Sequence, residues 1–191
     1  MTTYSFSLFD TAIGTCGIVW TARGIAGVQI HNASELATRA TLLRRFAGAE
    51  ETTPPAQVQR AIDGIVALLR GEKRDLSDVT IDADDLPEFN RKVYDIARTI
   101  LPGSTLTYGE IAERLGDKLL ARDVGQALGK NPIPLIVPCH RVLAAGGKTG
   151  GFSAPGGVVS KLRLLTIEGA QPSGPTLFDR LPLAAKHRRR S

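Results

Sequence analysis

The sequence predicts an α+β protein in which a small, mostly antiparallel sheet comes first and a mostly helical part follows. Short β-branched and aromatic runs separated by glycines fill the first third of the chain, whereas apolar residues at helical spacing dominate later. The length of 191 residues exceeds the roughly 100–150 of a typical domain. The length leaves one large domain or two small ones open. A domain boundary is predicted in the acidic, proline-containing stretch 81–87, because the sign of the charge changes there.

The predicted first domain covers residues 1–85. Residues 4–9, 18–20 and 28–30 have the alternation or β-branched content of strands. A helix is expected after Pro54 and Pro55, because apolar residues then recur on one helix face until Gly71 ends the pattern. One such helix can cover the predicted sheet.

The predicted second domain covers residues 86–170. A helix from Phe89 to Ile100 is followed by Thr107 and Glu110, which have the spacing of a capping box at the start of a short helix. A second short helix, 121–128, follows after a tight turn. Two short helices joined in this way favour a helix-turn-helix. Residues 171–191 are predicted to be a basic, flexible tail.

The charge distribution points to a polyanionic partner. Residues 1–88 carry 8 basic and 12 acidic side chains, whereas residues 89–176 carry 11 and 6. A basic half of this kind favours nucleic acid, although a solvated basic surface without a partner is an equal alternative. The sequence has no run long enough for a membrane span and no secretory signal pattern, so a cytoplasmic protein without membrane contact is expected.

The strongest chemical signal is the segment that ends in Cys139, His140 and Arg141. The apolar run 135–137 predicts a buried strand that delivers this polar cluster. Neighbouring cations lower the pKa of a thiol, so Cys139 is a candidate nucleophile. Successive strand residues point to opposite faces, so His140 can help only through a bend or a bridging water. Cys16 is interpreted as a small buried apolar residue.

The remaining candidate residues lie downstream. The glycine-rich stretch 146–157 predicts a loop that permits close backbone approach to a ligand. A helix from Val158 to Ile167 is predicted, and Glu168 at its end is either the third member of a hydrogen-bonded chain or a solvated glutamate. Two isolated cysteines and three scattered histidines lack metal-ligand spacing, so no metal and no cofactor are expected.

These residues resemble the O6-alkylguanine-DNA alkyltransferase family over residues 89–169. The specific match is the run Pro138-Cys139-His140-Arg141-Val142 preceded by Asn131-Pro132, and Leu106-Thr107-Tyr108-Gly109-Glu110-Ile111-Ala112 supports it. The resemblance implies a ribonuclease H-like α/β domain followed by a winged helix-turn-helix-like domain. The first 88 residues match only in their α/β character.

The resemblance also assigns roles to individual residues. Cys139 would accept the alkyl group, His140 would act as base through a water, Glu168 would orient His140, and Asn131 would tie the helical motif to the active site. The residues implied to bind DNA are Arg122, Tyr108 and Arg141. The residues implied to line the pocket for the substrate base are Tyr108, Val142, Ser153 and Leu128. Phe152, where a tyrosine is common, and Ala154-Pro155 depart from the family pattern and indicate a different alkyl-size preference.

The function implied by the resemblance is direct reversal of O6-alkylguanine damage, and of O4-alkylthymine damage. A monomer would bind double-stranded DNA through the minor groove, flip out the damaged base and transfer its alkyl group irreversibly to Cys139, once per molecule. Two alternatives stay open. One is a sensor or helix-turn-helix regulator that binds alkylated DNA without reacting, and the other is a cysteine hydrolase.

Overall fold

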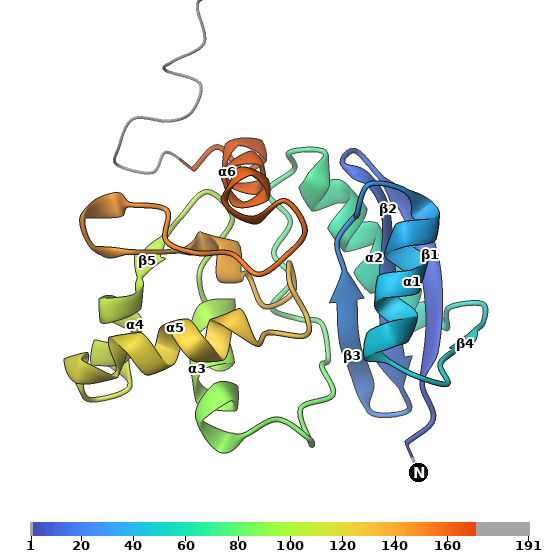
Figure 1. Ribbon diagram of the computed structural model, residues 1–191, viewed down its shortest axis with the longest axis horizontal. Helices are drawn as coiled ribbons and strands as arrows, with labels where there is room; N and C mark the ends of the chain where they lie inside the picture. The colour runs from blue at the N-terminus through green and yellow to red at the C-terminus, as the bar shows by residue number, and fades with distance from the viewer. Residues whose placement is uncertain (1, 171–191) are drawn as a thin grey trace, which may run out of the picture.

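The structure, a computed structural model, describes residues 2–170. The predicted tail at 171–191 lies outside the described residues. The first half contains a four-stranded sheet in the order β3-β2-β1-β4 (Figure 1), formed by β1 Ser5–Thr11, β2 Gly14–Thr21, β3 Gly24–Gln29 and β4 Glu50–Glu51. Within this sheet, only the short pairing of β1 with β4 is parallel. The small, mostly antiparallel sheet is therefore confirmed.

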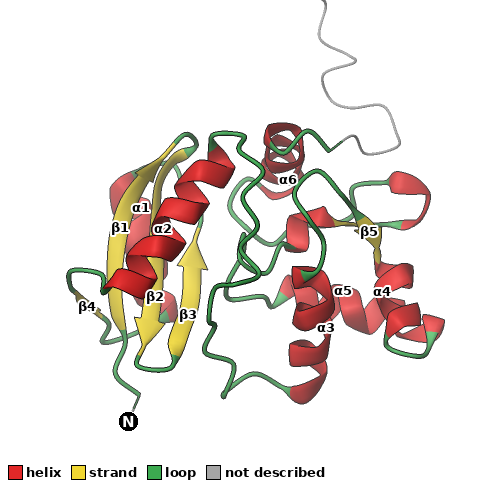
Figure 2. Ribbon diagram, turned by 180° about the vertical axis from the view of Figure 1, so that it is seen from behind, coloured by secondary structure: helices red, strands yellow, loops and turns green. Residues whose placement is uncertain are grey.

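Two helices cover opposite faces of this sheet (Figures 1 and 2): α1 Glu35–Arg45 and α2 Ala56–Leu69. The second was predicted and the first was not. Phe6 and Val19 pack with Leu42 of α1, whereas Ile18 belongs to the larger core on the α2 side. The helix α1 escaped detection because it buries few side chains and so has no long apolar stripe.

The second half is mostly helical, as expected (Figure 2). Its elements are α3 Glu88–Arg98, β5 Leu106–Thr107, α4 Tyr108–Arg114, η1 Lys118–Leu120, α5 Ala121–Gly129, η2 Cys139–Arg141, β6 Val142–Leu143, η3 Ala145–Gly147 and α6 Gly157–Ile167. Thr107 and Glu110 form the predicted capping box. Gly116, at a φ of 105°, ends α4 and leads through η1 into α5. The predicted pair of short helices is confirmed.

The predicted strand at residues 135–137 is wrong. These residues form a tight, buried loop in which Leu135 has a φ of 75° and the backbone N–H of Val137 donates to the carbonyl of Ile133 at 2.9 Å. A residue in the left-handed region breaks the extended path that a strand requires. Periodicity could not separate these cases, because any short buried segment is equally apolar.

The main core cluster draws on both halves of the chain. It includes Cys16, Ile18 and Trp20 from the sheet together with Tyr94 and Val137 from the second half. The backbone N–H of Val28 also donates to the carbonyl of Pro132 at 3.0 Å. Cys16 is fully buried, as predicted. Within residues 2–170, no helix has the length and apolar character to cross a membrane.

Candidate active site

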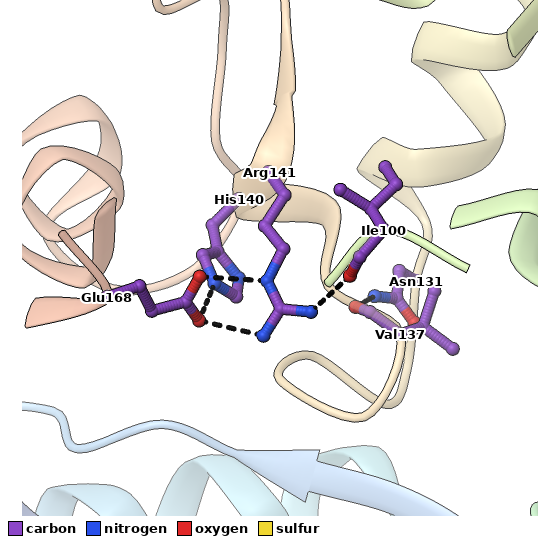
Figure 3. Close-up of polar contacts among 6 residues, drawn as sticks. All are labelled: Ile100, Asn131, Val137, His140, Arg141 and Glu168. Carbon is purple, nitrogen blue, oxygen red and sulfur yellow. Dashed lines mark hydrogen bonds and ion pairs between the residues drawn. The ribbon is translucent and has the colours of Figure 1, made fainter. Parts of the chain in front are cut away.

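A short helical turn carries the cysteine cluster. The backbone N–H of Cys139 donates to Val137 at 2.8 Å, and that of Arg141 donates to Pro138 at 2.9 Å, so residues 139–141 form the 3-10 helix η2. This turn supplies the bend that the sequence required. As a result His140 and Arg141 both reach Glu168 at the end of α6 (Figure 3).

Glu168 is the centre of a buried polar cluster. Its carboxylate lies 2.8 Å from Nε2 of His140 and accepts hydrogen bonds from Nε and Nη2 of Arg141 at 2.8 and 2.9 Å. Nη1 of Arg141 donates to the carbonyl of Ile100 at 2.5 Å (Figure 3). All three charged or ionisable side chains are buried. Glu168 is thus a member of a hydrogen-bonded chain and not a solvated glutamate.

The placement of Arg141 corrects the expectation that it contacts DNA. Its side chain is 4% exposed, and its guanidinium is held by Glu168 and Ile100. A phosphate could reach it only if this buried ion pair were broken. Arg141 instead neutralises Glu168 and fixes the position of that carboxylate.

The cluster determines which nitrogen of His140 is free. Burial alone would raise the pKa of Glu168, but the hydrogen bonds from His140 and Arg141 lower it to about 2. An ionised carboxylate only accepts hydrogen bonds, so Nε2 of His140 carries the proton and Nδ1 is an acceptor. Burial lowers the pKa of His140, which keeps the ring neutral. Nδ1 is buried and has no partner among the described residues.

Asn131 ties Cys139 to the end of α5. Its Nδ2 donates to Sγ of Cys139 at 3.3 Å and to the carbonyl of Val137 at 2.9 Å, and its Oδ1 accepts from the N–H of Ile133 at 2.9 Å. All hydrogen-bonding groups of the amide thus act on the segment that presents the sulfur. Arg45 braces the same segment from the first half of the chain, since its Nη2 donates to the carbonyl of Pro132 at 3.1 Å.

The pKa of Cys139 is raised, whereas the sequence analysis expected neighbouring cations to lower it. Burial raises the pKa of Cys139, and the hydrogen bond from Asn131 and the charge of Lys161 offset this only in part. The adjacent cations contribute little, because His140 is neutral and Arg141 is paired with Glu168. Cys139 therefore rests as a thiol, and its reaction requires a base.

Lys161 is a site residue that the sequence analysis missed. It lies on α6, is fully buried, and its Nζ donates to the carbonyls of Val142 at 2.6 Å and Gly151 at 3.3 Å. Nζ also lies 5.7 Å from the ring centroid of Tyr108. Burial lowers the pKa of Lys161 to about 8. The available signal was that Lys161 lies three and four residues before the apolar Leu164 and Leu165, on the same face of the predicted helix.

A cavity of about 460 Å³ opens beside Cys139. Its lining includes Tyr108, Leu128 and Ser153, as the sequence analysis expected for a base pocket. Val142 is the exception. It is fully buried and does not line this cavity, and its carbonyl is occupied by Lys161. The expectation for Val142 is therefore corrected.

Arg122 occupies an exposed position on the first turn of α5. No ion pair restrains its side chain within the described part of the chain, although the exposed Asp123 follows it. The position leaves Arg122 free to meet another molecule. For residues 2–170, the structure brings no three His, Cys, Asp or Glu side chains together in an arrangement that could hold a metal ion.

Comparison with known proteins identifies the family. Residues 88–170 match the family model of the 6-O-methylguanine DNA methyltransferase DNA-binding domain. The chain is 33% identical over 158 residues to the methylated-DNA–protein-cysteine methyltransferase of Methanothermobacter thermautotrophicus, covering 83% of this chain and 81% of that protein. It is 41% identical over 129 residues to the enzyme of the same name from Mycobacterium tuberculosis, covering 67% and 76%.

A solved structure is similar over most of its length. The crystal structure of Mycobacterium tuberculosis OGT in complex with DNA superimposes with a TM-score of 0.69 at 31% identity, covering 86% of this chain and 92% of that one. The chain belongs to the methylated-DNA–protein-cysteine methyltransferase family. The family and the enzyme class predicted from the sequence are thereby confirmed.

Proposed function

We propose that this protein repairs O6-alkylguanine, and O4-alkylthymine, in double-stranded DNA by transferring the alkyl group to Cys139 in a single irreversible turnover. The observation that carries this proposal is the arrangement around the thiol. A buried Glu168–His140 pair leaves one imidazole nitrogen unpartnered, and Cys139 lies at the wall of a cavity. A base and a binding pocket are what a protonated nucleophile needs.

We propose that the proton of the Cys139 thiol passes to His140, which is hydrogen-bonded to Glu168. A water between Nδ1 of His140 and Sγ of Cys139 would pass the thiol proton to the imidazole, and the Glu168 carboxylate would stabilise the resulting imidazolium. The thiolate then attacks the alkyl carbon as its bond to the guanine oxygen breaks. The proton returns to the departing guanine, so atoms and charge balance. The product is a thioether, and thiol exchange cannot reverse it.

The DNA would be engaged by the helical half. We propose that α4 and α5 act as a winged helix-turn-helix in the minor groove, with Arg122 filling the gap left by the flipped nucleotide. The base would enter the 460 Å³ cavity beside Tyr108 and Ser153. The exposure of Arg122 and the cavity at Cys139 support this assignment.

The remaining expectations complete the proposal. The first half, with a sheet covered on both faces, is proposed to be ribonuclease H-like and to end near residue 85. The protein is proposed to act as a monomer in the cytoplasm. Its two cysteines are free thiols, which supports a reducing compartment.

The decisive experiment measures transfer of a radioactive methyl group from DNA to the protein. Incubation with DNA carrying O6-methylguanine with a radioactive methyl group should transfer one equivalent of label to the protein, and peptide mapping should place it on Cys139. Cys139→Ala should accept no label, whereas Cys16→Ala, which changes the other cysteine, should accept it as the wild type does. Tight binding of damaged DNA without any mass increase would instead establish the sensor.

The role of Arg122 is tested by comparing two substrates. Arg122→Ala should slow repair of a duplex by at least tenfold, because the flipped state loses its support, and leave transfer from free O6-benzylguanine within twofold of wild type. The substitution is exposed and should not alter folding. An equal loss with both substrates would contradict the proposed role.

A further inference from the structure

A second cavity meets Cys139 from the direction of the first half of the chain. Its volume is about 450 Å³, and its walls come from residues 28–45 on one side and 129–155 on the other. Cys139, Phe152 and Ser153 line both this cavity and the 460 Å³ cavity assigned to the base. The sulfur therefore lies where two cavities meet, and the proposed base pocket is only one of them.

The second cavity is positively charged. Arg44, Arg45 and Lys130 are among its lining residues, and no Asp or Glu is. The side chain of Arg45 is bonded to neutral acceptors, the side-chain oxygen of Gln29 at 3.1 Å and the carbonyl of Pro132 at 3.1 Å. Within residues 2–170, neither Arg44 nor Lys130 belongs to an ion pair. Three cations thus share one cavity without a compensating acid.

The cavity is also much larger than a methyl group requires. A methyl group is about the size of a water molecule, which takes up roughly 30 Å³ in the liquid. In a displacement at carbon, the transferred group ends on the sulfur and remains there. It must therefore fit in the space that the base leaves free.

The geometry points to this second cavity as a subsite for the transferred group, selective for anionic alkyl groups such as the carboxymethyl group of O6-carboxymethylguanine. This inference rests on the proposed function. A carboxylate on the transferred group would enter a cavity that Cys139 shares with Arg44 and Lys130 and in which no acid offsets their charge. A neutral group of the same shape would gain less, because a carbonyl dipole interacts more weakly with these cations than a full negative charge does.

The reaction is the proposed one with a charged group. The bond from Sγ to the methylene carbon forms while the bond from that carbon to the guanine oxygen breaks. The thiol proton passes through His140 to the guanine, and the carboxylate stays on Cys139 as a carboxymethyl thioether. No oxidant, reductant or further reactant takes part.

The test uses a matched pair of substrates. Single-turnover rates are measured on duplexes with O6-carboxymethylguanine and with O6-carbamoylmethylguanine, which has the same shape but no charge. The ratio of the two rates is compared between wild type and an Arg44→Gln/Lys130→Gln double variant. Comparing ratios removes the intrinsic difference in reactivity between the substrates. Arg60→Gln, an exposed change on α2 outside the cavity, is the control for loss of charge.

The double variant should lower the ratio of carboxymethyl to carbamoylmethyl transfer by about fivefold or more, since two partly screened charge interactions are lost. Arg60→Gln should leave the ratio unchanged, and both proteins should repair O6-methylguanine within twofold of wild type. An unchanged ratio in the double variant overturns the inference. Equal slowing on all three substrates also overturns it, because the cations would then serve DNA phosphates.

The two proposals fail in different ways. If the wild type transfers no methyl group to Cys139, the proposed function fails. If methyl transfer is normal but the ratio does not respond to the cavity cations, only the anionic subsite fails. Arg45 is left unchanged in this test because it braces Pro132 beside the active site.

Discussion

Replacing Arg141 with methionine should strongly destabilise the protein, because the buried Glu168 carboxylate would lose its cationic partner. Two of the three side-chain contacts to the Glu168 carboxylate come from Arg141, at 2.8 and 2.9 Å. The pKa of Glu168 is lowered from 4.5 to about 2. That difference, to which His140 and Arg141 both contribute, corresponds to about 3 kcal/mol of stability at neutral pH. Breaking a buried ion pair by removing one partner costs about 3–5 kcal/mol, in agreement.

The sign of the pH dependence follows from the lowered pKa. A carboxyl whose pKa is lower in the folded state stabilises the protein above its unfolded pKa, and this stability is lost as the pH falls from about 4.5 to about 2. The wild type should lose this contribution on acidification. The variant lacks the part of this contribution that Arg141 supplies, so the difference in stability between the two should shrink below pH 4.5.

Urea unfolding followed by tryptophan fluorescence measures this difference. The single tryptophan, Trp20, is 7% exposed and belongs to the core cluster that spans both halves. Arg122→Met is the matched control, because it removes an exposed arginine, and should change stability by less than about 0.5 kcal/mol. The reasoning is refuted if Arg141→Met costs less than about 1 kcal/mol at pH 7, or if its cost is the same at pH 3.

Two further predictions concern the thiol. Lys161→Met removes a nearby cation that lowers the pKa of Cys139, so this pKa should rise. Alkylation of Cys139 by iodoacetamide at pH 7 should then slow severalfold. Unchanged alkylation with an unchanged melting temperature would exclude an electrostatic role for Lys161. The second prediction concerns His140, which must be neutral to accept the proton of the Cys139 thiol. Burial lowers the pKa of His140, so the single-turnover rate of alkyl transfer should stay constant from pH 8 to below 6.5 and fall only at more acidic pH. A rate that declines with a midpoint at or above 6.5 would contradict this assignment.

Local interactions explain why much of the fold could be predicted. The helix α2 repeats its apolar residues along one face, and the capping box joins Thr107 to Glu110 only three residues away. Such features depend on neighbours in the chain. The helix α1 was missed because it buries only Thr38 and Leu42 and so lacks a long apolar stripe. The loop at 135–137 was mistaken for a strand because its apolar run does not reveal the left-handed backbone at Leu135.

The site shows the same division. The proposed nucleophile, the proposed base and the amide that bonds to the sulfur could be named because Cys139 and His140 are covalent neighbours in a specific motif with Asn131 nearby. The inward direction of the Arg141 side chain could not be predicted from the sequence, because its partners Ile100 and Glu168 are 41 and 27 residues away in the chain. The protonated state of the Cys139 thiol could not be predicted from the sequence either, because it depends on burial.

The amino-acid sequence alone determined the family, the order of the main elements and the choice of Cys139 as the candidate nucleophile, because these depend on residue type and short-range spacing. Tertiary structure decided which charges are paired, which nitrogen of His140 is free, and that the sulfur lies between two cavities. The physical reason is that desolvation and ion pairing depend on what surrounds a group in space. Residues far apart in the chain supply those surroundings.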